Sequence, residues 1–424
     1  MSDFSSSIRL AAMLLVAALT ASIHAQTPNS SSPVMPAGSA RRESSPQVRQ
    51  ATFEKAWQIV RDKFFDPNFN GADWNKVHEQ YRPLAAAAKT DAELYEVLKR
   101  MLGELHVSHM EIITPEEMAQ FSAPPVTTGL GLRTIGGEVV VMRILPGSSA
   151  ERLGLRPGYL IKQIDGAEVK DLNDAHVKLR GAANTKVRVS YLDEHDQLRE
   201  SVLDRSLLGP AQVDRQKMGK LSIYSLLESK RLEGGIGYIR FSTFIVSLRK
   251  KLNAAIDSMQ DAPGLIIDLR ANGGGDDSLA IELANHLVQK PTVLMITRTR
   301  KGDTDYYRAR PTRRPYLGPV VFLVDEGSGS ASEQLTAGLE EAGRAYIIGK
   351  KTEGEDMDAD AAQLPTGAIL VYAAGEPRTP KGVVIEGRGV IPDLEVDVTR
   401  RGLLNGNDAQ LSAAIKYINS KSIH

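Results

Sequence analysis

The chain has 424 residues, of which 42% are hydrophobic and 25% are charged. This length exceeds one ordinary core and predicts two or three globular domains. Lysine plus arginine equals aspartate plus glutamate, 52 each, so no net field draws the chain to nucleic acid or to an anionic membrane. The absence of cysteine excludes disulfides, thiolate nucleophiles and cysteine metal sites. The eight histidines form no H-E-x-x-H pattern, so we expect neither a metal ion nor another cofactor.

The first 25 residues have the pattern of a targeting segment. Arg9 provides a positive flank, an apolar run extends from Leu10 to Leu19, and a small residue stands at the cut site. This pattern is typical of a secretory signal peptide, and the run is too short for a permanent membrane span. An uncleaved anchor is the alternative, because Asp3 weakens the positive flank. We therefore expect a periplasmic, secreted or envelope-associated protein with no stable membrane insertion after cleavage.

The next two segments differ in composition and in the spacing of their apolar residues. Residues 26–48 are rich in Ser, Pro and Ala and are predicted to form a disordered linker. Over residues 49–123, apolar side chains recur at spacings of three and four, which predicts an N-terminal helical domain. Thr90 and Glu93 have the spacing of a capping box, at the start of a helix expected to end near Gly103.

From residue 124 the pattern changes to short β-rich runs with glycine turns. The turns are P-G-S-S-A at 146–150, G-L-R-P-G at 154–158 and I-K-Q-I-D-G at 161–166. These segments and the order of the strands resemble a PDZ domain over residues 124–208. The resemblance implies a groove that binds an extended peptide end by strand addition. The residues expected to contact that peptide are Gly129, Leu130, Gly131 and Leu132. A PDZ fold that serves only as a structural spacer is the alternative.

Residues 209–404 alternate between strands and helices, as in an α/β layer, and residues 405–424 are predicted to form a C-terminal helix and tail. An apolar strand from Pro319 to Val324 leads into a glycine- and serine-rich turn that contains Ser330, and a helix is expected to follow. Such a turn places Ser330 beside the free N–H groups of the helix, which suits a nucleophile whose attack creates an oxyanion. Simple capping of the helix by Ser330 or Ser332 is the alternative.

Three segments of this α/β region carry a family resemblance. They are L-R-A-N-G-G-G at 269–275, G-S-G-S-A-S-E at 327–333 and G-R-A-Y-I-I-G-K-K-T-E-G at 343–354. Together with the domain order, they resemble the carboxyl-terminal processing, or tail-specific, serine proteases. The resemblance implies an α/β multidomain fold with an N-terminal helical domain, a PDZ-like β domain and a ClpP/crotonase-like α/β serine protease core. It further implies that Ser330 is the nucleophile, and that the backbone of Gly274 and Ala331 forms the oxyanion hole.

The expected general base is where the sequence departs from the usual family pattern. Most members use a lysine twenty-five residues after the nucleophile, and this chain has Glu355 there. The segment G-E-L-H-V-S-H at 103–109 instead resembles the tricorn-type branch, in which the last histidine is the base. The resemblance therefore implies that His109 is the base, oriented by Ser108 and by Glu386. A packing histidine and a solvated turn carboxylate are the alternatives for His109 and Glu386, and His106 is a weaker competitor.

Two functions of different classes follow from these observations. The first is a serine endopeptidase that acts on protein or peptide substrates with an accessible C-terminus. The second is a pseudoprotease that binds peptides in the envelope without cutting them, which the replacement of the dyad lysine by Glu355 motivates. The sequence leaves a homo-oligomer open and does not name the substrate.

Overall fold

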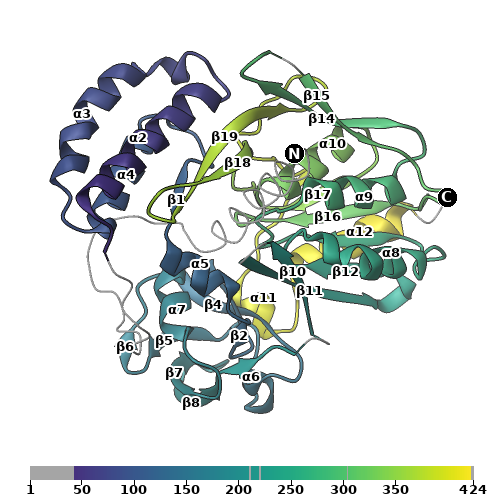
Figure 1. The fold of residues 1–424 in the computed structure, drawn as a ribbon. Coiled ribbons are helices and arrows are strands. Elements are labelled where there is room, and N and C mark those ends of the chain that lie inside the picture. Colours follow the sequence, from purple (N-terminus) through teal and green to yellow (C-terminus); the bar gives the residue numbers. More distant parts are fainter. Residues whose placement is uncertain (1–42, 210–211, 219–220, 303, 422–424) are drawn as a thin grey trace.

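The computed structural model describes residues 43–209, 212–218, 221–302 and 304–421 (Figure 1). The predicted signal peptide and most of the predicted linker lie outside these residues. Within the described ranges, no helix is both long enough and apolar enough to span a bilayer. The chain forms a helical unit, a small β unit and a larger α/β core, which confirms the predicted fold class.

Three helices make up the N-terminal unit: α2 (Pro46–Lys63), α3 (Trp74–Ala87) and α4 (Asp91–Gly103). α2 begins before residue 48, where we expected the linker to end, because Ser45 caps the helix through the Val48 N–H and Pro46 suits its first turn. The predicted capping box at α4 is half correct. The Thr90 hydroxyl accepts the Glu93 N–H, but the Glu93 carboxylate accepts the N–H of Lys89 instead.

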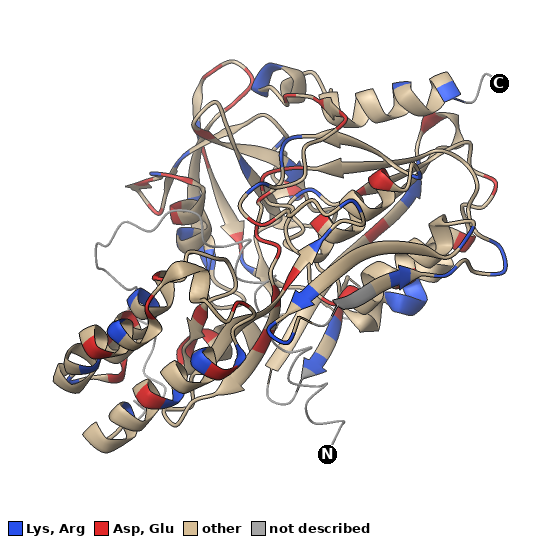
Figure 2. Ribbon diagram, turned by 90° about the horizontal axis from the view of Figure 1, so that it is seen from above, with Lys and Arg blue, Asp and Glu red and all other residues tan. Residues whose placement is uncertain are grey.

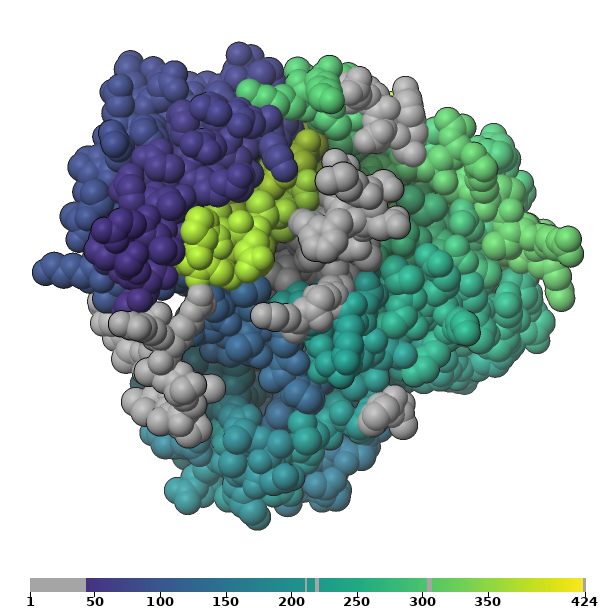
Figure 3. Space-filling view, in the orientation of Figure 1, coloured from purple at the N-terminus to yellow at the C-terminus, as the bar shows by residue number. Residues whose placement is uncertain are grey.

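The helical unit packs on a β-hairpin that comes from the far end of the chain. The hairpin consists of β18 (Asp358–Gln363) and β19 (Ile369–Arg378). Its apolar residues Leu364, Leu370 and Tyr372 share one buried cluster with the helices. Figure 3 shows the hairpin directly beside the helices. Residues from both ends of the chain therefore build a single hydrophobic core.

The β unit has the topology of the predicted PDZ domain. Its sheet runs in the order β3 (Leu130–Ile135), β4 (Glu138–Ile144), β5 (Leu160–Ile164), β7 (Lys186–Leu192) and β8 (Leu198–Asp204). β6 (Ala167–Glu168) pairs with β5, and the unit's helices are α6 (Ser149–Arg152) and α7 (Leu172–Leu179). β3 lies at an edge of the sheet and α7 contacts it, so one side of β3 is open to strand addition.

The α/β core is built on a seven-stranded sheet. Its strands, in order, are β10 (Val213–Met218), β11 (Leu221–Arg231), β12 (Gly237–Phe241), β13 (Leu265–Asp268), β16 (Val320–Val324), β17 (Tyr346–Gly349) and β20 (Leu394–Glu395). The strands from β12 to β20 are parallel. Helices α8 (Arg249–Asp257), α9 (Asp277–Leu287) and α10 (Ala331–Glu341) cover one face, and α12 (Ala409–Lys421) covers the other. Burial on both faces explains why β13 and β16 are almost wholly apolar.

A second sheet joins the helical unit to the α/β core. It contains β1 (Glu111–Ile113), β19, β14 (Thr292–Thr299) and β15 (Thr304–Ala309), with β18 paired to β19. After β1, α5 (Pro115–Ser122) leads to the PDZ unit, whose entry and exit pair as β2 (Val126–Thr127) and β9 (Ser206–Leu207). Near the C-terminus, α11 (Arg400–Leu404) packs on the PDZ unit, where Arg400 donates to the carbonyl oxygens of Gly158 at 3.0 Å and Asp193 at 2.8 Å.

Candidate active site

Ser330 stands at the junction between the turn after β16 and the start of α10. Its φ of 49° and ψ of −120° lie outside the regions that residues other than glycine normally adopt. Two acceptors hold this conformation, because the Ser330 N–H points to Glu355 O at 3.0 Å and to Glu333 Oε2 at 3.0 Å. Backbone strain of this kind is concentrated at functional sites, which supports Ser330 independently of any sequence motif.

The turn that carries Ser330 is locked to the neighbouring glycine-rich turn. The Asp325 carboxylate accepts the N–H groups of Ala271 at 2.8 Å and Gly327 at 2.9 Å, and it pairs with Arg133 of the PDZ strand β3. Asn272 O accepts the Gly329 N–H at 3.1 Å. The two turns therefore form one rigid support beneath the nucleophile, and the PDZ unit contacts it directly.

The structure brings Gly274 and Ala331, the predicted oxyanion residues, together. A Cβ atom on Gly274 would lie 2.8 Å from Ser330 Cβ and 2.9 Å from Ala331 N, so only glycine fits this approach. Ala331 is the first residue of α10, where a backbone N–H has no acceptor within the helix. The Gly274 N–H, in contrast, donates to Asn272 Oδ1 at 3.0 Å. Its close approach is therefore explained, while its role as an oxyanion donor stays a prediction.

Ser108, His109 and Glu386, the other predicted catalytic residues, form a hydrogen-bonded relay. The Ser108 hydroxyl lies 2.6 Å from His109 Nδ1 and 2.8 Å from Glu386 Oε2. The Ser108 N–H also donates to Glu386 Oε1 at 2.7 Å, across a sequence separation of 278 residues. His109 is only 3% exposed and has a positive φ of 60°. His106, the weaker competitor, is exposed.

The direction of these bonds fixes the tautomer of His109. A serine hydroxyl has one proton, and the Glu386 carboxylate has only acceptors, so the Ser108 proton points to Glu386. Ser108 Oγ must then accept from His109, which places the imidazole proton on Nδ1. The lone pair of Nε2 remains available to take a proton, as a general base requires. Burial lowers the pKa of His109 to about 3, which keeps the imidazole neutral near pH 7.

A short backbone segment links this relay to the nucleophile. The Asp356 N–H donates to Glu386 Oε2 at 2.8 Å, while the preceding carbonyl, Glu355 O, accepts the Ser330 N–H. Within the described residues, Ser330 Oγ and His109 Nε2 are not hydrogen-bonded to each other. Catalytic hydrogen bonds often tighten only when substrate is bound, so a direct contact between Ser330 Oγ and His109 Nε2 stays a prediction.

Glu333 is a site residue that the sequence analysis missed. It is fully buried, and its carboxylate accepts the N–H groups of Ser330 at 3.0 Å and Gly354 at 2.8 Å and the hydroxyl of Thr352. Burial raises the pKa of Glu333 above its ordinary value. Glu333 is the third residue of α10, and an acid at this position can accept the backbone N–H of the residue that caps the helix. The spacing of three residues between Ser330 and Glu333 could therefore have predicted this contact from the sequence.

The predicted peptide-binding residues of the PDZ unit lie at the start of its edge strand. Gly129 has a φ of 93°, and a Cβ there would lie 2.0 Å from Ser148 Oγ, so the turn requires glycine. Leu130, Gly131 and Leu132 then begin β3. The structure thus places all four residues on the strand and turn where strand addition would occur, while peptide binding itself stays a prediction.

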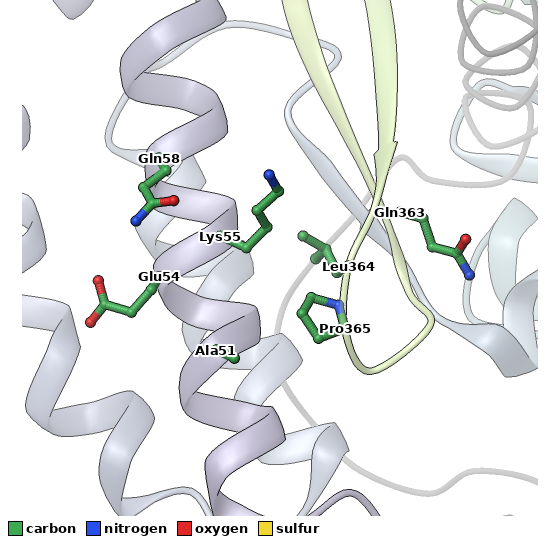
Figure 4. Close-up of a pocket in the computed structure, with 7 residues that line it drawn as sticks. All are labelled: Ala51, Glu54, Lys55, Gln58, Gln363, Leu364 and Pro365. Atoms are coloured by element: carbon green, nitrogen blue, oxygen red, sulfur yellow. The ribbon is translucent and has the colours of Figure 1, made fainter. Parts of the chain in front are cut away.

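Other surface features are less informative. A hollow of about 640 Å³ lies between α2 and the turn joining β18 to β19, and its lining contains none of the predicted catalytic residues (Figure 4). Positive and negative residues are interspersed over the view in Figure 2. Among the residues that the structure describes, no group of His, Asp or Glu is arranged to hold a metal ion.

Comparison with known families agrees with this geometry. Residues 235–396, which include the nucleophile turn and Glu386, match the model of Peptidase family S41. The chain therefore contains a Peptidase family S41 domain. Residues 45–103 match the Tricorn protease C1 domain, and residues 140–192 match a PDZ domain. This S41 serine peptidase therefore has the helical, PDZ and protease parts that the sequence predicted.

Similar proteins are carboxyl-terminal processing proteases. The chain is 29% identical over 383 residues to the "Carboxyl-terminal-processing protease" of Synechocystis sp., covering 86% of this chain and 85% of that protein. It is 26% identical over 335 residues to the "Carboxy-terminal processing protease CtpA" of Bacillus subtilis, covering 76% and 68%.

Solved structures show the same fold. The structure titled "Photosystem II D1 C-terminal processing protease" has a TM-score of 0.57 at 28% identity and covers 85% of this chain and 98% of that one. The tricorn protease has a TM-score of 0.54 at 19% identity, covering 89% of this chain and 37% of that one. At 19% identity the second likeness shows the fold alone.

Proposed function

We propose that this S41 peptidase is exported, captures the C-terminal end of a protein in its PDZ groove and cleaves the polypeptide with Ser330. His109 is the proposed general base, and Ser108 and Glu386 orient it. The observation that carries this proposal is the relay from Glu386 through Ser108 to His109, because it leaves the basic nitrogen of a buried imidazole free. The names of the relatives support the choice of a processing protease.

The proposed chemistry follows from these contacts. Ser330 Oγ attacks the carbonyl carbon of the scissile bond while its proton passes to His109 Nε2. The oxyanion then forms at the N-terminus of α10, where the Ala331 N–H is the expected donor. The imidazolium is stabilised because Ser108 Oγ accepts its Nδ1–H while the Ser108 hydroxyl donates a hydrogen bond to the Glu386 carboxylate. His109 next protonates the leaving amine, and a water molecule hydrolyses the acyl-enzyme through the same base.

The low pKa of His109 has a consequence for this step. Burial disfavours the imidazolium, so negative charge close to the imidazole is needed when Nε2 takes the proton. The oxyanion and the Glu386 carboxylate provide two such charges. Proton transfer and oxyanion formation are therefore expected to be tightly coupled.

The test uses purified chain without the predicted signal peptide, incubated with an unstructured protein. Ser330→Ala should abolish cleavage, and His109→Ala should lower kcat by about 10³-fold or more. His106→Ala is the matched control, because this neighbouring histidine is exposed and lies outside the relay, and it should retain cleavage. No cleavage by the unmodified protein would contradict the peptidase proposal and favour the peptide-binding pseudoprotease.

Capture and export have their own tests. Replacing the substrate's C-terminal carboxylate by an amide should raise KM with little change in kcat if the PDZ groove holds that end. An unchanged KM would favour the spacer alternative. A reporter that is active only outside the cytoplasm should become active when residues 1–25 are fused to it, and removal of the apolar run from Leu10 to Leu19 should prevent this.

A further inference from the structure

The loop that joins β15 to β16 is strongly basic. Residues 307–318 include four arginines and no acid, although the whole chain has no net charge. All four arginines are exposed, and so is a lysine just before β14. We call these five residues the basic patch: Lys290, Arg308, Arg310, Arg313 and Arg314.

The pairing of β14 with β15 brings the lysine to the arginines. Thr292, the first residue of β14, pairs with Ala309, the last residue of β15. Lys290 lies two residues before this pair and Arg310 lies one residue after it, so both extend from the same end of the two strands. The cations that precede and follow the hairpin therefore share one part of the surface.

Backbone contacts hold the loop in one shape. The Arg310 N–H donates to Asn285 Oδ1 at 2.6 Å and the Thr312 N–H donates to Asn285 O at 3.0 Å, which ties the loop to the end of α9. Further along, the Tyr316 N–H donates to His286 O at 2.7 Å, and Tyr316 is buried. The backbone of the loop is thus already ordered, so a partner that binds the arginines does not have to order it.

In the part of the chain that the structure describes, none of the five cations forms an ion pair or a side-chain hydrogen bond. Other exposed arginines do have such partners; Arg188, for example, pairs with Glu200 at 3.3 Å. Five like charges in one part of the surface repel one another, and an anionic partner would relieve that repulsion. The basic patch is therefore complementary to a negatively charged surface.

An exposed apolar side chain in the same loop indicates which kind of anionic partner fits. Leu317 is 66% exposed and follows the buried Tyr316. Arginine binds phosphate groups through two parallel hydrogen bonds, and an exposed leucine beside it can enter the apolar layer beneath lipid headgroups. A single-stranded nucleic acid would instead favour exposed aromatic side chains that stack on bases, and Tyr316 is not exposed. The combination fits a lipid surface.

We propose that the basic patch and Leu317 bind the surface of a bilayer that contains anionic phospholipid. The binding is peripheral, with the arginines at the lipid phosphates and the leucine at the boundary of the acyl chains. The loop ends where β16 begins, whereas Ser330 follows the other end of β16, so the patch and the candidate active site lie at opposite edges of the parallel sheet. A protein bound in this way keeps its active site open to soluble substrates. The competing account is a solvated surface that only keeps the protein soluble.

Sedimentation with lipid vesicles tests the proposal. Purified chain without residues 1–25 is mixed with vesicles of phosphatidylcholine alone, or of phosphatidylcholine and phosphatidylglycerol in equal parts. We expect binding only to the anionic vesicles, and weaker binding as the salt concentration rises from about 0.05 to 0.5 M. The double variant Arg313→Gln/Arg314→Gln should bind about 25-fold more weakly, because each basic residue near an anionic surface strengthens binding about fivefold.

Two further variants separate the patch from net charge and lipid from other anions. Arg156→Gln/Arg401→Gln is the matched control, because it removes the same charge from two exposed arginines, in the PDZ unit and in α11, that form no ion pair among the described residues. Its affinity should stay within about twofold of the unmodified protein. Leu317→Ser should weaken binding about fivefold or more at every salt concentration, because burial of the leucine is not an electrostatic contribution. Thermal melting checks that each variant is folded.

Three results would overturn the proposal. The first is equal binding, or no binding, to the two kinds of vesicle. The second is an equal loss of affinity in the two double variants, because binding would then follow net charge and not the patch. The third is tight binding of heparin together with vesicle binding that Leu317→Ser leaves unchanged, which would indicate a site for soluble polyanions. None of these measurements requires cleavage, so they decide the matter whether or not the protein is an active peptidase.

Discussion

The substitution Ser108→Ala tests the proposed relay more sharply than removal of His109 itself. It deletes one oxygen atom that lies 2.6 Å from His109 Nδ1 and 2.8 Å from Glu386 Oε2. The nucleophile, the imidazole and the oxyanion turn stay intact. A loss of activity would therefore report on orientation and charge stabilisation, because Ser108 acts on the reaction only through the histidine.

The size of the effect follows from the bond that is lost. In the ground state the imidazole is neutral, but in the transition state it carries a proton, and a hydrogen bond to a charged group contributes about 1.5–3 kcal/mol. At 1.36 kcal/mol for each tenfold change in rate, kcat should fall by about 10- to 160-fold. KM should change little, because Ser108 is not expected to touch substrate. Ser108→Thr keeps the hydroxyl and should recover much of the rate.

Steady-state kinetics on an internally quenched peptide would measure the effect, with thermal melting as a check on folding. Nitrogen chemical shifts of His109 supply a readout that a merely structural residue would not move. The unmodified protein should show the proton on Nδ1, and Ser108→Ala should lose that strict preference. Wild-type kcat in Ser108→Ala, or a proton on Nε2 in the unmodified protein, would refute the relay.

Three further outcomes are expected. Glu333→Ala removes the acceptor of two buried donors, the Gly354 N–H and the Thr352 hydroxyl, and should lower the free energy of unfolding by about 2 kcal/mol or more, measured by chemical denaturation. Glu355→Lys should not create a Ser–Lys dyad, because Glu111 and Glu353 would keep the new ammonium charged; cleavage by the double variant His109→Ala/Glu355→Lys would contradict this. Thermal stability should fall as pH rises from 5 to 8, because the pKa of Glu111 and of Glu353 is about 8 in the folded protein, so the native state binds more protons than the unfolded state over this range. Glu111→Gln should flatten that decline, and an unchanged slope in melting temperature against pH would show that Glu111 does not titrate there.

Local patterns in the sequence were sufficient for much of the fold. The apolar runs after Gly264 and Pro319 became β13 and β16, and the periodic segment after Thr90 became α4. These predictions succeed because a strand buried on both faces is a continuous apolar run, and a helix buried on one face has apolar residues at spacings of three and four. The turn at Ser330 was also predictable, because the strand before it and the helix after it follow each other directly in the chain.

The acidic residues around the site were not predictable in this way. The segment T-E-G-E-D-M-D at 352–358 is rich in acids and is typical of a solvated loop, yet Asp356 is fully buried. The approach of Ser108 to Glu386 depends on the packing of the helical unit against β19, and residues alone did not indicate it. Only the family resemblance brought those positions together. The docking of α11 on the PDZ unit was not predictable from the sequence, because Arg400 binds there to two carbonyl oxygens and to Asp196, which lies about 200 residues away in the chain.

The replacement of the dyad lysine by Glu355 is compatible with an intact nucleophile turn because the backbone and the side chain at this position have separate roles. The carbonyl of residue 355 holds the Ser330 N–H whatever side chain it carries, so the strained serine keeps its support. The general base, in contrast, must come from another part of the chain. The proposed base, His109, lies between the helical unit and β1. Its orientation depends on Glu386 and on the pairing of β1 with β19. A Ser–Lys pair lies within one domain, but a Ser–His arrangement of this kind requires the helical unit to stay docked. Mutations that loosen the cluster around Leu370 and Tyr372 should therefore impair catalysis from a distance, through loss of the base.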